Sequence, residues 1–109
     1  MEIDIARPGR TIILRGRLDV STVADVRLAL HEAVDCGSGD LLVDLAEVDV
    51  VDASGLGVLV GAHRRAGRAG RRLVLRNVPE RILRLLALTR LNRVLHIEVV
   101  VPAPLAATG

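Results

Sequence analysis

The chain has 109 residues, half of them apolar, which suffices for one hydrophobic core but not for two domains. It has no Phe, Tyr or Trp, so it lacks the aromatic platform on which single-stranded nucleic acids usually stack their bases. With 15 basic and 13 acidic residues its net charge is only +2, and its one cysteine excludes an internal disulfide and a cysteine-built metal site.

Neither targeting nor membrane insertion is indicated. Residues 1–9 lack the basic start and the apolar run of a signal peptide, and no apolar stretch approaches the roughly 20 residues that span a bilayer. Cys36 is unpaired, which suits a reducing compartment, and we expect it in a loop or a packed position rather than in a redox role. We therefore expect a cytoplasmic protein that does not contact a membrane.

The first part of the chain predicts a hairpin, a helix and a buried strand. Apolar residues on both sides of the turn at residues 7–10 predict a β-hairpin. Apolar residues at helical spacing then predict a helix from Thr22, where Asp25 completes a capping box, to Gly37. The apolar run at residues 41–43 predicts a strand at the centre of the sheet, covered by helices on both faces.

The second part continues the alternation of helices and strands. A second helix is predicted after residue 52, with Gly70 closing it and three arginines on its outer face, Arg64, Arg68 and Arg71. A strand at residues 73–75, a helix at residues 79–88 and a last strand near residues 94–100 follow.

These elements predict an α/β fold with a single domain. Their order, β-β-α-β-α-β-α-β, implies a mixed sheet with an N-terminal hairpin and right-handed crossovers between its later strands. We place this domain at residues 1–100 and, because two prolines interrupt regular pairing, a flexible tail at residues 101–109. A monomer or a weak dimer is expected.

Residues 52–57 read Asp-Ala-Ser-Gly-Leu-Gly and join a strand to the second helix. Ser54 would lie at or just before the helix N-terminus, where its hydroxyl can accept from free N–H groups and the helix dipole favours a negative charge. Taken alone, a serine at a helix start is usually structural.

Common catalytic motifs fail on spacing. The nucleophile elbow needs glycine where Asp52 stands, and the phosphate loop needs a lysine, which the chain lacks. The dinucleotide fingerprint needs glycine or alanine where Val60 stands. Three histidines, His31, His63 and His96, lie on separate elements without metal-ligand spacing. We expect no enzymatic activity, no cofactor and no metal.

Two segments of the chain resemble the signature of the STAS domain, namely LVDL at 42–45 and VDASGLGVL at 51–59. That family joins sulfate transporters and anti-sigma factor antagonists. The likeness covers roughly residues 3–99 and includes GRLD at 16–19, before the first helix. Since the chain has no membrane segment, it resembles the free-standing antagonists.

The resemblance implies a function in partner switching and transcription regulation. An unphosphorylated antagonist binds an anti-sigma factor that is also a serine kinase, which frees a sigma factor. The kinase then phosphorylates the antagonist, which dissociates, and a metal-dependent serine phosphatase resets the cycle.

The resemblance also implies the site residues. Ser54 matches the phosphorylated serine, and the partner-binding surface comprises Asp19, Asp52, Ser54, Gly55, Leu56 and Gly57, where the two glycines leave the loop open. Two residues depart from the family pattern: Ala53 replaces a common hydroxyl residue, and Arg90 stands where many relatives have glycine.

Two other functions remain open. The chain could be a STAS scaffold whose Ser54 is never phosphorylated, as a subunit of a signalling or lipid-transport assembly. It could instead bind nucleic acid through Arg64, Arg65, Arg68, Arg71 and Arg72, but a solvated helix face is favoured for these arginines, so no direct nucleic acid partner is expected.

Overall fold

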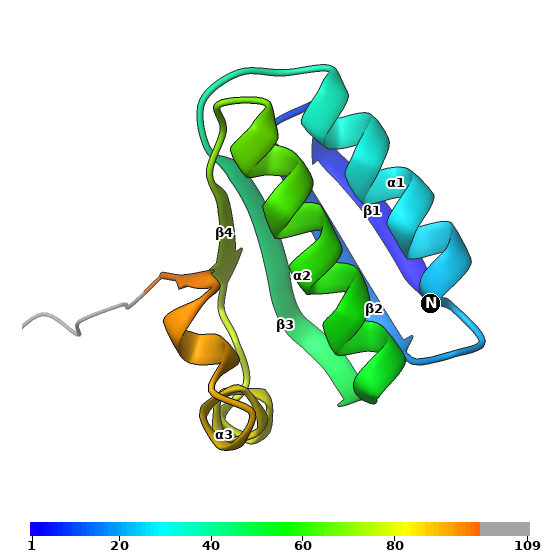
Figure 1. Ribbon diagram of the computed structural model, residues 1–109. Coiled ribbons are helices and arrows are strands. Elements are labelled where there is room, and N and C mark those ends of the chain that lie inside the picture. The colour runs from blue at the N-terminus through cyan, green and yellow to red at the C-terminus, as the bar shows by residue number, and fades with distance from the viewer. Residues whose placement is uncertain (99–109) are drawn as a thin grey trace, which may run out of the picture.

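Five strands and three helices make up the fold in this computed structural model, which describes residues 1–98 (Figure 1). The strands are β1 (Glu2–Arg7), β2 (Thr11–Leu18), β3 (Leu41–Val51), β4 (Leu73–Arg76) and β5 (His96–Ile97). The helices are α1 (Val23–Asp35), α2 (Ala53–Arg68) and α3 (Glu80–Leu88), and a 3-10 turn follows at Leu91–Arg93. The predicted α/β class and the order of elements are confirmed.

The strands form one mixed sheet in the order β1-β2-β3-β4-β5. β1 pairs antiparallel with β2 through the predicted hairpin, whose turn contains Gly9 at a φ of +68°. The remaining neighbours pair in parallel, so the carboxyl ends of β2, β3 and β4 lie at one edge. There Leu18 is the register partner of Val51, which places the segments after these two residues side by side.

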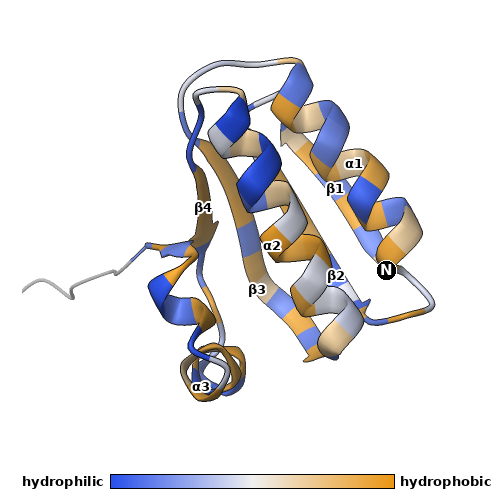
Figure 2. Cartoon of the chain, in the orientation of Figure 1, coloured by the Kyte–Doolittle hydropathy of each residue, from blue (hydrophilic) through white to orange (hydrophobic). Residues whose placement is uncertain are grey.

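The core lies between one face of the sheet and the helices α1 and α2 (Figure 1). Alternate residues of the strands point to this face and meet the apolar stripes of the two helices. Figure 2 shows the apolar colour along β3 and β4 and hydrophilic colour in the last turns of α2. Fully buried members include Ile12, Leu14, Val43, Leu45, Leu30 and Leu59.

The opposite face of the sheet corrects one prediction. β3 is central, as expected, but α1 and α2 cover only one of its faces, and Leu42 on the other face is half-buried. Leu42 lies opposite Val74 in the β3–β4 register, so a neighbouring strand supplies its apolar contact instead of a helix. A strand can therefore carry a continuous apolar run even when helices cover only one of its faces.

The start of α1 lies where the sequence predicts it, but its capping box does not form. The Thr22 hydroxyl turns away from the helix, donating to Arg17 O at 2.8 Å and accepting from Asp19 N at 3.1 Å. It makes no side-chain capping bond. Thr22 thus stabilises the loop before α1 and does not cap the helix.

The end of α2 also differs from expectation. Gly70, at a φ of +71°, closes the helix as predicted, and Arg71 N donates to Ala66 O at 2.8 Å. Arg71 itself was expected on the outer face but is buried, because the chain turns inward after Gly70. Its guanidinium donates to four carbonyl oxygens, those of Gly9, Ala33, Val34 and Gly39.

The last described elements are short. α3 begins after Pro79, as predicted, and buries Ile82 and Leu86. The last strand was expected near residues 94–100, but Val94 precedes it, and the part within the described chain is His96–Ile97. The predicted tail at residues 101–109 lies outside the described residues. Across residues 1–98, no helix combines the length and apolar character needed to cross a membrane.

Candidate functional site

Asp52 organises the junction between β3 and α2. It is the N-cap of α2, and its carboxylate accepts from Gly55 N at 2.9 Å through Oδ1. Its second oxygen, Oδ2, accepts from Val20 N at 3.1 Å. Because β2 and β3 end at the same edge of the sheet, one side chain can cap the helix and hold the loop before α1.

Gly55 allows the close approach that this arrangement needs. It is buried, and a Cβ at this position would overlap Leu18 O and lie 2.9 Å from Leu18 Cγ. The first turn of α2 therefore packs directly on the end of β2. Gly55 acts from beneath the site and does not leave the loop open, whereas Gly57 is exposed with open space around its Cβ position.

Ser54 is the second residue of α2 and is exposed. The position at the helix start is as predicted, but the capping role belongs to Asp52. Within residues 1–98 the Ser54 hydroxyl makes no hydrogen bond. Ser54 thus presents a free hydroxyl where backbone N–H groups and the helix dipole favour a negative charge.

Asp19 lies in the neighbouring loop and is only 9% exposed. Its carboxylate accepts from Ser21 Oγ at 2.5 Å, Ser21 N at 3.0 Å and Arg17 Nε at 3.0 Å. The Ser21 hydroxyl, followed by Arg17, lowers the pKa of Asp19 below its usual value. Asp19 therefore stays ionised and holds the loop that carries Val20.

Val20 is a site residue that the sequence analysis missed. Its side chain is 73% exposed, while its backbone N–H is held by Asp52. The accessible part of the site thus combines Val20, Ser54 and Gly57, with Asp52 half-buried between the loops. Leu56 is buried and supports this surface from the core. Only the position of Val20, directly after Asp19 in a predicted loop, could have indicated it.

The five arginines near the end of α2 do not form one surface. Arg71 is buried, Arg65 pairs with Asp35 at 2.6 Å, and Arg72 pairs with Asp40 at 2.9 Å. Arg64 and Arg68 are exposed. This dispersal agrees with the preference for a solvated helix face over a phosphate-binding patch.

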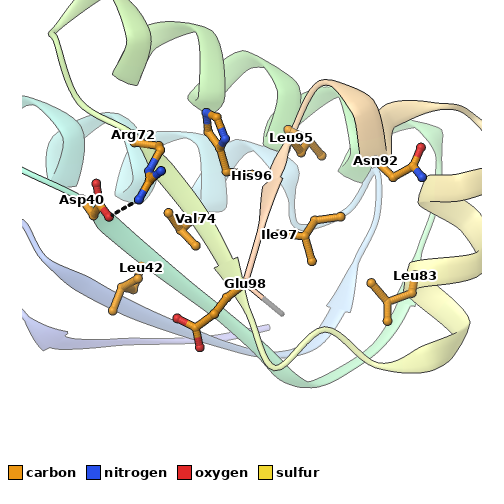
Figure 3. A pocket seen from close by; sticks show the side chains of 10 residues that line it. All are labelled: Asp40, Leu42, Arg72, Val74, Leu83, Asn92, Leu95, His96, Ile97 and Glu98. Carbon is orange, nitrogen blue, oxygen red and sulfur yellow. Dashed lines mark hydrogen bonds and ion pairs between the residues drawn. The ribbon is translucent and has the colours of Figure 1, made fainter. Parts of the chain in front are cut away.

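A groove beside β5 lies apart from the Ser54 surface (Figure 3). Its lining includes Leu42, Val74, Leu83 and Ile97, with the Asp40–Arg72 ion pair at one end. No residue from 52–57 lines it. Within the described chain no three His, Cys, Asp or Glu residues gather as metal ligands.

The histidines depart from their expected scatter in one respect. His63 on α2 and His96 on β5 are far apart in sequence, yet their ring centroids lie 5.3 Å apart.

Cys36 is exposed at the end of α1, one of the two positions expected for it.

Comparisons with known proteins agree on the fold and on a family. Residues 1–101 match the family model described as "Mlab, STAS domain". An anti-sigma-B factor antagonist of Staphylococcus epidermidis is 35% identical over 83 residues, which cover 76% of this chain and 77% of that protein.

Solved structures show the same fold. An anti-sigma-factor antagonist (STAS) domain protein from Planctomyces limnophilus matches with a TM-score of 0.74 at 18% identity, covering 91% of each chain. The anti-sigma factor antagonist SpoIIAA matches in its unphosphorylated form with a TM-score of 0.67, at 18% identity over 92% of this chain and 88% of that one. Its phosphorylated form, from Bacillus, matches with a TM-score of 0.66 at 18% identity, covering 90% of each chain.

Proposed function

The chain belongs to the STAS domain family, and from this membership we propose that it is an anti-sigma factor antagonist switched by phosphorylation of Ser54. Unphosphorylated, it binds an anti-sigma factor that is also a serine kinase and so frees a sigma factor. Phosphorylated, it dissociates, and a metal-dependent serine phosphatase restores it. The chain itself contributes no catalytic step.

The observation that carries the proposal is the exposure of Ser54 at the start of α2. A kinase must reach the hydroxyl, and Ser54 is exposed while its neighbours Gly55 and Leu56 are buried. Gly57 is also exposed and has no side chain to obstruct an approaching active site. The loop therefore offers one accessible hydroxyl on a rigid support.

The fold is suited to carry a phosphate at this position. The group would add about −1.5 to −2 charge near the N-terminus of a 16-residue helix, where the dipole favours an anion. The cap of α2 is made by Asp52 and does not involve the Ser54 hydroxyl. Phosphorylation should therefore change the surface and leave the domain folded.

The surface around Ser54 explains how a phosphate could release a partner. Val20 supplies an exposed apolar contact next to Asp52, so the unmodified site is partly apolar and already acidic. One acidic group of the partner at about 6 Å from the phosphate would cost roughly 3 kcal/mol per unit charge at an effective dielectric of 20. That corresponds to about a hundredfold loss of affinity.

A kinase assay tests the proposal. The purified anti-sigma factor kinase and ATP should place one phosphate on the wild-type chain, located at Ser54 by peptide mass spectrometry. Ser54→Ala should accept none and should bind the kinase with unchanged Kd, whereas Ser54→Asp should bind more weakly. Ser38→Ala is the matched control, because Ser38 is an exposed serine in the segment after α1, away from this site, and it should be phosphorylated like the wild type.

Two outcomes would reject the switch. One is a phosphate on Ser21, Thr22 or Ser38 in place of Ser54, and the other is equal affinity of the phosphorylated and unmodified forms for the kinase. Either would favour the scaffold alternative, a STAS subunit without phosphorylation. One observation favours this second candidate. The family model that matches the chain is described as "Mlab, STAS domain" and not as an anti-sigma factor antagonist.

A further inference from the structure

The last described strand is held to the sheet by few interactions. β5 consists of two residues, whose register partners are Val74 and Leu75 on β4, and Glu98 N donates to Leu75 O at 2.8 Å. Such a short pairing at one end of the sheet order can open locally without unfolding the domain. Side-chain contacts therefore decide whether β5 stays in place.

One such contact joins β5 to α2. The imidazoles of His63 and His96 lie with ring centroids 5.3 Å apart and planes inclined by 54°. His63 Nδ1 is shielded from solvent and has no hydrogen-bond partner within the described chain. A neutral imidazole tolerates one unpaired nitrogen, but a protonated ring would bury an N–H donor without an acceptor and add charge next to the second ring.

The charged groups around His63 offer no compensation, whereas Asp40 lies close enough to His96 for that ring to add to the lowering of the Asp40 pKa by Arg72. Arg64 on α2 adds positive charge near His63, and burial, then His96 and Arg64, lower the pKa of His63 below its ordinary value. The nearby Asp40 pairs with Arg72, and Glu98 pairs with Arg76. No carboxylate of residues 1–98 forms an ion pair with either imidazole.

A resident metal ion does not explain the pair. Within the described chain no third His, Cys, Asp or Glu gathers with the two rings as a metal ligand, so the unpaired His63 Nδ1 has no ligand set around it. The same unpaired nitrogen is what a proton-sensitive contact requires.

We propose that the His63–His96 contact is an acid-sensitive latch, and that protonation of His63 releases β5 from β4 and from α2. Three of the groove-lining residues, His96, Ile97 and Glu98, then leave the groove together (Figure 3). The free edge of β4 and the apolar residues beneath it become accessible below the usual histidine pKa of about 6.5. The latch is independent of Ser54.

Amide hydrogen exchange measured by NMR at two pH values tests the latch. After correction for the intrinsic exchange rate, protection of the Glu98 amide should fall several-fold between about pH 7.5 and about pH 5.5, because protonation of His63 favours the open form. Protection of the Val26 amide, which donates to Thr22 O in α1, should change less than about twofold over the same range.

Variants separate the latch from general acid sensitivity. His63→Leu should make Glu98 protection independent of pH, and His63→Gln, which keeps a polar but uncharged side chain, should do the same if the first variant folds poorly. His96→Gln, which removes only the neighbouring ring, should reduce the response without abolishing it. His31→Gln is the matched control, since burial lowers the pKa of this half-buried histidine on α1 as well, and it should keep the wild-type response.

The latch is overturned if Glu98 protection is equal at both pH values, or if it falls by the same factor as Val26 protection, which would mean global unfolding. It is also overturned if the response persists in the His63 variants, or if it appears only before treatment with EDTA, which would indicate a bound metal.

Discussion

Val20 and Asp52 are joined by a hydrogen bond from the Val20 backbone N–H to Asp52 Oδ2 at 3.1 Å. This bond couples the loop before α1 to the cap of α2. It also explains how the apolar side chain of Val20 can be held in an exposed position near the start of α2, since its backbone is fixed by Asp52.

Removing the Asp52 carboxylate should destabilise the domain. Asp52→Ala loses both the cap on Gly55 N and the bond to Val20 N, so we expect a loss of about 1–2 kcal/mol in the free energy of unfolding by urea. Asp49→Ala, at a nearby exposed position, should change it by less than about 0.5 kcal/mol. Equal effects of the two changes would contradict the role given to Asp52.

The two site glycines should respond oppositely to alanine. Gly55→Ala places a methyl group against Leu18 and should cost about 1–3 kcal/mol. Gly57→Ala faces open space inside α2 and should stabilise by about 0.5–1 kcal/mol through helix propensity. Chemical unfolding measures both, and a stable Gly55→Ala protein would show that α2 does not need its close approach to β2.

Arg71 should be far less tolerant of substitution than its exposed neighbour on α2. Arg71→Lys cannot reproduce the fork of donors that reaches carbonyls on three segments, so we expect a loss of at least about 2 kcal/mol. Arg68→Lys, on the exposed face, should stay within about 0.5 kcal/mol. Similar melting temperatures for the two variants would refute the buried role.

Arg90 adopts a φ of +61° and a ψ of 13°, the left-handed conformation that favours glycine. Relief of strain, offset by the greater freedom of glycine in the unfolded chain, should make Arg90→Gly neutral or more stable by up to about 1 kcal/mol. Arg93→Gly, in the following 3-10 turn, should instead be neutral or destabilising. Thermal unfolding distinguishes them, and a clear loss for Arg90→Gly would mean that its side chain holds the turn.

Asp19 should make stability depend on acid. Its pKa is lowered in the folded state, mainly by the Ser21 hydroxyl and then by Arg17, so folding gains stability above the unfolded value of about 3.9. That gain disappears as the pH falls through the lower folded value. Asp19→Asn should therefore narrow the difference in urea midpoint between neutral and acidic pH. A midpoint difference that matches the wild type would contradict this contribution.

Local chemistry accounts for what the sequence predicts correctly. The start of α2 after Asp52 follows from a residue that favours helix N-termini, and Gly70 marks the end of this helix because few other residues adopt its backbone conformation. These signals depend on neighbours within a few residues. The position of Ser54 at the start of α2 followed from the same reasoning, whereas its accessibility was implied by the family resemblance.

The features that the sequence did not predict depend on contacts between distant segments. The burial of Arg71 requires carbonyls from the hairpin turn and from the end of α1, and the His63–His96 contact requires α2 to lie beside β5. Periodicity cannot show that Leu42 faces an uncovered side of the sheet, nor that Asp52 would hold Val20. Each of these needs the completed tertiary arrangement.

Arg71 also bears on how the protein can be made on the ribosome. Its guanidinium bonds to Gly9, Ala33 and Val34, which leave the exit tunnel long before Arg71 does. Until translation has passed residue 71, these carbonyls lack their native donor, even when the hairpin and α1 have already emerged. Nascent chains halted before this point should therefore yield under little mechanical force, and resistance should rise once Arg71 has cleared the tunnel.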